Sequence, residues 1–68
     1  MISYNPLWKT LIDKNMKKTD LIKLTHISNG TLAKLGKNES VSLSIIDKIC
    51  MTLDCKIEDV VEIKKEQS

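Results

Sequence analysis

The stretch DLIKLTHISNGTLAKLGK, residues 20–37, predicts two short helices joined by a tight turn centred on His26. Ser28 is a favourable N-cap for the second helix, because its hydroxyl can accept a hydrogen bond from a free backbone N–H of the first turn. Gly36 is expected to end that helix. The first helix begins shortly before residue 20, so the complete helix-turn-helix unit covers about residues 18–37.

The second of these helices has two contrasting sides. At about 100° per residue, Leu32 and Leu35 fall together on an apolar side that can pack against the rest of the chain. The opposite side carries small, amide-bearing or cationic residues: Asn29, Gly30, Ala33, Lys34 and Lys37. A helix held by two Leu presents this polar side outward, which is the layout that a DNA-reading helix needs.

Length and composition favour a single small domain covering residues 1–68. Apolar residues make up 41% of the chain, recur at spacings of three and four, and are interrupted by only two Gly and one Pro. This pattern predicts an all-α fold with a core of mostly Leu, Ile and Val. No apolar run approaches the ~18 residues of a membrane span and no signal-peptide pattern is present, so we expect a soluble, cytoplasmic protein.

The charge is unevenly distributed along the chain. Residues 1–37 carry seven Lys against two Asp, a balance of +5, whereas residues 38–68 carry four Lys against seven acids, a balance of −3. A domain polarised in this way suits one side that faces DNA and another that avoids it. Lys residues that only keep a small domain hydrated explain the same charge equally well.

Two helices are predicted before the helix that Ser28 caps, and the second of them is the first helix of the helix-turn-helix unit. The first has Asn5 as its N-cap and Pro6 at its first helical position, and it runs to about Lys14. The second begins between Lys17 and Thr19, with Thr19 as the better local start signal. Their predicted buried sides consist of Leu7, Trp8, Leu11 and Ile12 in the first helix and of Leu21, Ile22, Leu24 and Thr25 in the second.

The second half of the chain predicts a fourth helix, capped by either Ser42 or Ser44 and ended at Asp54. Residues 57–61 are expected to form a short fifth helix or a turn. Residues 60–63 could instead be extended and pair with residues 2–4, closing the two chain ends together. The predicted core side of the fourth helix consists of Leu43, Ile46, Ile49, Cys50 and Leu53.

The residues with the most reactive side chains do not form a recognisable chemical site. His26, the sole His, stands where the turn needs a positive φ, which His tolerates better than most residues. Cys50 and Cys55 fit no usual zinc spacing and supply too few ligands, so we interpret Cys50 as a buried free thiol. The sequence offers no acid/base pair, nucleophile–base pair or phosphate loop. We therefore expect no enzyme activity, metal, cofactor or small-molecule ligand.

The segments DLIKLTHIS, TLAKLGK and VSLSIIDKICMTLDC resemble the Cro/CI-type helix-turn-helix family, also called the XRE or lambda-repressor-like DNA-binding domains. The resemblance is strongest to small single-domain bacterial regulators and implies a compact five-helix domain. By this resemblance, Leu21 and Ile22 match buried positions, His26 the turn glycine, and Leu32 the anchor of the recognition helix.

The resemblance also implies which side chains meet DNA. The base-facing positions of the family fall on Ser28, Asn29, Gly30, Ala33 and Lys34, and the backbone-facing positions on Lys17, Lys18, Thr19, Lys37 and Asn38. The chain has no Arg, so Lys34 would act on guanine as a point charge rather than a bidentate fork. Asn29 is suited to adenine, and the Ala33 methyl to a thymine methyl.

These observations predict a sequence-specific DNA-binding transcriptional regulator, expected to be a repressor. Its recognition helix, residues 28–36, would enter the major groove of double-stranded DNA. A homodimer on a palindromic operator, with half-sites ~34 Å apart, is expected because one small domain offers few base contacts. The alternative is a protein-interaction module of the same fold, antitoxin-like or an adaptor, with weak or no DNA binding.

Overall fold

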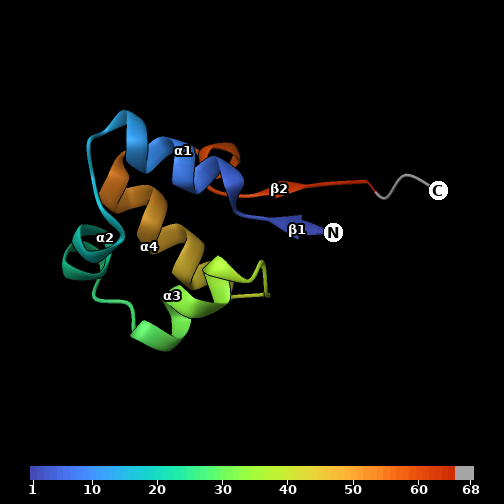
Figure 1. Cartoon of the computed structure of the whole chain (residues 1–68), viewed down its shortest axis with the longest axis horizontal. Helices are drawn as coiled ribbons and strands as arrows, with labels where there is room; N and C mark the ends of the chain where they lie inside the picture. The colour runs from blue at the N-terminus through green and yellow to red at the C-terminus, as the bar shows by residue number, and fades with distance from the viewer. Residues whose placement is uncertain (66–68) are drawn as a thin grey trace.

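The computed structural model describes residues 1–65 and contains four short α-helices, one 3-10 turn and a two-stranded sheet in that part of the chain (Figure 1). In Figure 1, α4 runs diagonally through the middle, with α1 above it, α2 to the left and α3 below. The elements, in chain order, are β1 (Ile2–Ser3), α1 (Asn5–Asp13), α2 (Lys18–Thr25), α3 (Asn29–Gly36), α4 (Leu43–Leu53), η1 (Ile57–Asp59) and β2 (Glu62–Ile63).

Four helices are present instead of the predicted five, because the segment after α4 forms only the 3-10 turn η1. Asp54 takes a left-handed conformation, with φ 52°, and ends α4. The Lys56 N–H then donates to Asp59 Oδ2 at 3.1 Å, which closes a tight turn. Val60, directly after this turn, is fully buried, and the chain then becomes extended at β2.

The predicted pairing of the two chain ends is confirmed. β1 and β2 are antiparallel, with Ile2 opposite Ile63 and Ser3 opposite Glu62. The Met1 ammonium donates to the Lys64 carbonyl at 2.8 Å, and the Lys64 N–H donates back to the Met1 carbonyl at 2.8 Å. Figure 1 shows the paired strands extending away from the helices.

Every α-helix contributes one completely buried aliphatic side chain to a shared core. Leu7 of α1, Leu21 of α2, Leu35 of α3 and Ile49 of α4 are each 0% exposed. Helices of 8 to 11 residues are marginal in water on their own, so these contacts are what makes them stable. α3 is therefore held in place chiefly through Leu35.

Three residues predicted to be buried are instead exposed: Ile12 at 72%, Leu24 at 55% and Leu43 at 75%. Ile12 lies in the last turn of α1, and Leu43 is the first residue of α4. In a domain of this size, helix ends and outer turns extend past the neighbouring elements, so an apolar stripe is only partly covered.

The predicted start of α1 was wrong by one residue, whereas α2 begins at Lys18, within the predicted range. α1 has Tyr4 at its N-cap position, without a side-chain cap, and Asn5 is its first residue. α2 has Lys17 at its N-cap rather than Thr19, and the Lys17 N–H donates to Asp20 Oδ2 at 2.9 Å. Asp20 lies in the first turn of α2, where its carboxylate accepts this hydrogen bond and interacts favourably with the positive end of the helix dipole.

The start of α4 provides a matched pair of serines for a stability test. Ser42 is the N-cap, and its Oγ accepts from the Ile45 N–H at 3.3 Å, whereas Ser44 lies exposed inside the helix. We expect Ser42→Ala to lower the free energy of unfolding by about 1 kcal/mol, measured by urea denaturation. Ser44→Ala should leave it unchanged or raise it slightly, because Ala is the better helix former. Equal losses from both variants would contradict the assignment of Ser42 as the cap.

Candidate nucleic-acid interface

The turn between α2 and α3 is built around a left-handed residue. His26 has φ 60°, as predicted, and its N–H donates to the Ile22 carbonyl at 2.8 Å, which closes α2. Thr25 is buried, with its Oγ1 donating to the Leu21 carbonyl. Ile27 follows and is 5% exposed, so the turn is pinned to the core on both sides of an exposed His26.

Ser28 begins α3 as predicted. Its Oγ accepts a hydrogen bond from the Thr31 N–H at 3.0 Å and lies 3.0 Å from Thr31 Oγ1. The hydroxyl satisfies one of the free backbone donors of the first turn. Ser28 is exposed, but its side chain is already used to hold the start of the helix.

The two sides of α3 are arranged as the periodicity predicts. Leu35 is fully buried and Leu32 is half-buried against the core. The predicted base-facing residues are all exposed: Ser28, Asn29, Gly30, Ala33 and Lys34. They form a narrow surface of small and amide side chains with one cation on it.

α3 ends at Gly36, as predicted. Gly36 is still helical and has no positive φ, and the left-handed residue is Asn38, with φ 58°. Asn38 Oδ1 accepts from the Tyr4 N–H at 3.1 Å, and the Tyr4 hydroxyl donates to the Glu39 carbonyl at 2.8 Å. One acceptor of Asn38, predicted to meet the DNA backbone, is therefore used to tie the loop after α3 to the N-terminal segment.

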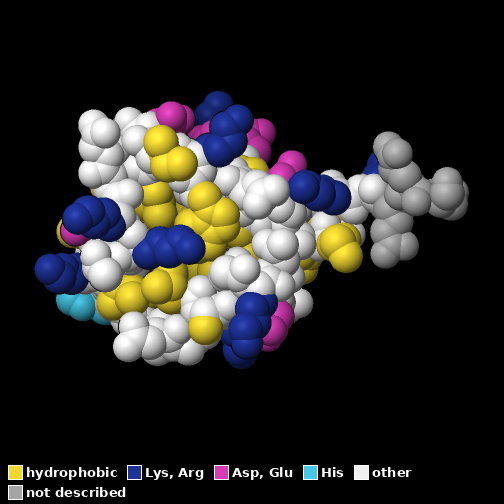
Figure 2. Space-filling model, viewed as in Figure 1, with side chains coloured by type: hydrophobic (Ala, Val, Ile, Leu, Met, Phe, Trp, Pro, Cys, Tyr) yellow, Lys and Arg dark blue, Asp and Glu magenta, His cyan; other side chains and the backbone are white. Residues whose placement is uncertain are grey.

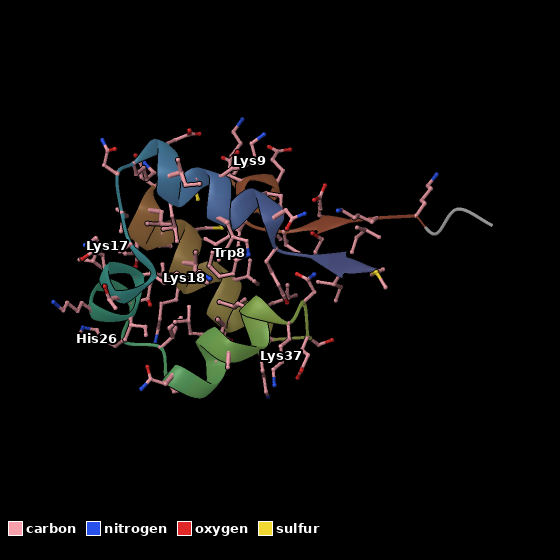
Figure 3. The ribbon with its side chains drawn as sticks, viewed as in Figure 1. Trp8, Lys9, Lys17, Lys18, His26 and Lys37 are labelled. Atoms are coloured by element: carbon pink, nitrogen blue, oxygen red, sulfur yellow. The ribbon has the colours of Figure 1, made fainter. Side chains whose placement is uncertain are left out.

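The residues predicted to face the DNA backbone are exposed at the two ends of the helix-turn-helix unit. Lys17, Lys18 and Thr19 lie at the start of α2, and Lys37 follows α3 (Figure 3). Lys18 has an unexpected neighbour, because its Nζ lies 4.5 Å from the centroid of the Trp8 ring. No signal in the sequence links these two residues, which belong to different helices.

A shallow hollow of about 240 Å³ lies beside this contact, between α1 and the start of α2. Its lining is largely hydrophobic, and Figure 2 shows a dark blue side chain lying across a yellow surface on this face. The lining residues are Trp8, Leu11, Ile12, Met16, Lys17 and Lys18.

The other chemically reactive residues lie away from α3. Cys50 and Cys55 are free and half-buried, and burial together with the neighbouring Cys50 raises the pKa of the Cys55 thiol. Among residues 1–65, no three His, Cys, Asp or Glu side chains gather in a way that could hold a metal ion. None of the helices in the same range has the length and hydropathy to cross a membrane.

Comparison with known proteins assigns this geometry to a family. The family model for the Cro/C1-type HTH DNA-binding domain matches residues 6–66. A solved structure, that of the transcriptional regulator VanUg in crystal form II, superposes with a TM-score of 0.91 at 49% identity, over 96% of this chain and 87% of that one. No curated protein matches the sequence. The chain therefore belongs to the Cro/C1-type helix-turn-helix DNA-binding family.

Proposed function

We propose that this protein is a transcriptional regulator that inserts α3 into the major groove of double-stranded DNA. The observation that carries the proposal is the exposed side of α3, with Asn29, Ala33 and Lys34 outward and Leu35 buried beneath them. The 49% identity with the transcriptional regulator VanUg supports the same role. A major groove admits one α-helix, and short polar side chains on its outer side can then reach base edges.

Each outward residue of α3 offers a distinct chemical contact. The Asn29 amide can donate to and accept from adenine, and the Ala33 methyl can pack against a thymine methyl. Lys34 can donate to guanine acceptors. The Ser28 Oγ already accepts a hydrogen bond from the Thr31 N–H, so Ser28 would contact the DNA mainly through the rest of its exposed surface.

Lys17, Lys18, Thr19 and Lys37 are proposed to meet phosphates on either side of the groove. These residues lie exposed at the start of α2 and just after α3, so they flank the helix that would read the bases. Asn38 can donate its amide N–H groups to a phosphate, while its Oδ1 accepts from the Tyr4 N–H. Phosphate contacts set the affinity and the position of the protein along the DNA, whereas the base contacts of α3 set the sequence preference.

We further propose that the protein binds a palindrome as a homodimer and represses transcription by occluding a promoter. One α3 spans few base pairs, so two copies on half-sites ~34 Å apart would supply the specificity that one lacks. Selection of bound sequences from a random duplex pool would test binding, preference and half-site symmetry together. A pool without enrichment, and no NMR shift of α3 amides with duplex DNA, would favour the protein-interaction module.

Asn29 and Lys37 should affect binding in different ways. We expect Asn29→Ala to weaken binding to the selected sequence by about 1–3 kcal/mol and to leave random DNA unaffected. Lys37→Ala should weaken both and lower the slope of log K against log salt by about 0.9. Fluorescence anisotropy over a salt series measures both quantities. Equal losses on selected and random DNA for Asn29→Ala would contradict its role as a base contact.

Gly30 and Gly36 test whether DNA approaches the start of α3 closely. A Cβ at Gly30 would meet only Ser28 Oγ at 3.7 Å, and one at Gly36 would meet nothing within 4 Å, so the fold accepts Ala at both. Both variants should raise the free energy of unfolding, by up to ~1 kcal/mol. Only Gly30→Ala should weaken DNA binding, by about tenfold, because its methyl would stand between α3 and the bases. Full affinity in both variants would show that Gly30 is not needed for close approach.

A further inference from the structure

Lys18 and Trp8 form a cation–π pair between two helices. Lys18 is the first residue of α2, and its Nζ lies 4.5 Å from the centroid of the Trp8 ring on α1. Figure 3 shows Lys18 lying between α2 and Trp8. An ammonium at this distance is attracted by the negative face of the indole ring.

The indole is itself held in a defined place. Trp8 is half-buried and packs against the core, between the fully buried Leu7 and the nearly buried Leu11 of the same helix. The acidic residue nearest to Lys18 in sequence, Asp20, is directed elsewhere, since its Oδ2 accepts from the Lys17 N–H at 2.9 Å. The ring is thus a fixed platform for one particular cation at the start of α2.

We propose that Trp8 is a positioning residue for Lys18, holding its ammonium where the start of α2 would meet a DNA phosphate. This inference rests on the proposed function. The ring approaches the ammonium from one side and leaves N–H donors free for an anion. A long Lys side chain that is ordered before binding loses less conformational entropy when the complex forms. The pair would therefore raise DNA affinity without Trp8 touching a base.

A double-mutant cycle tests this inference directly. Trp8→Leu should weaken duplex binding by roughly two- to tenfold in the otherwise unchanged protein. In a Lys18→Met background the same substitution should have no further effect, because the cation that Trp8 positions is gone. In a Lys17→Met background, the control, the loss from Trp8→Leu should persist. An undiminished loss in the Lys18→Met background would overturn the inference.

Two further readouts separate positioning from a structural role. Trp8→Leu should keep the salt slope of the wild type, whereas Lys18→Met should lower it by about 0.9, since only the latter removes a phosphate contact. Trp8→Phe keeps an aromatic face but lacks the indole N–H, and should recover most of the affinity lost in Trp8→Leu. Binding by Trp8→Phe as weak as that of Trp8→Leu would overturn the role of the ring face.

The free protein supplies a measurement that does not depend on DNA. Trp8 is the sole Trp of the chain, so its fluorescence reports on the ring alone. Lys18→Met should change the emission of Trp8, and Lys17→Met should not; identical spectra for all three proteins would overturn the pairing. Failure of the wild type to bind duplex DNA would refute the proposed function. Binding with an additive cycle would refute only the positioning role.

Discussion

The burial of one aliphatic side chain from each α-helix in a shared core is the interaction on which the rest of this domain depends. Leu7, Leu21, Leu35 and Ile49 come from four helices that are too short to persist alone. α3 lies near the edge of this arrangement and has Leu35 as its completely buried residue. The outward side of α3 has a fixed direction only because Leu35 is in the core.

In the proposed interface, base recognition and phosphate binding are carried out by different residues. The polar surface of α3 is small and offers an amide, a methyl and one ammonium, so it can distinguish bases only at a few positions. All the cations around it are Lys, which would contact phosphates as flexible point charges. In the role proposed for it, Trp8 would order the Lys18 side chain before DNA binds, through the contact of 4.5 Å between the ammonium and the ring.

Local signals in the sequence predicted the parts of the structure that local contacts determine. Ser28 as a cap and the positive φ of His26 depend on residues within one turn, and both were predicted. One contact between distant residues, the pairing of the chain ends, was also predicted, as one of two alternatives for residues 60–63. Periodicity also identified the buried and exposed sides of α3.

Several features that the sequence did not predict depend on how distant residues meet. Asn38 takes a left-handed conformation, with φ 58°, in a loop tied to Tyr4 by hydrogen bonds across 34 and 35 residues, and no signal in the sequence indicated this. Ile12 and Leu43 continue apolar stripes beyond the point where another element covers them, which periodicity within one helix cannot reveal. The pair of Lys18 and Trp8 likewise depends on how α1 and α2 pack.

The hydrogen bonds of Tyr4 connect the paired chain ends to the loop that follows α3. The segment that pairs with β2 continues directly into Tyr4, whose N–H and hydroxyl bind Asn38 and Glu39 immediately after α3. Detaching β1 therefore also removes support from the end of the recognition helix. By thermodynamic linkage, a change that stabilises or destabilises the strand pairing also changes the stability of the end of α3. The free energy of coupling is the same in both directions. The small sheet and the end of α3 are thus connected through Tyr4.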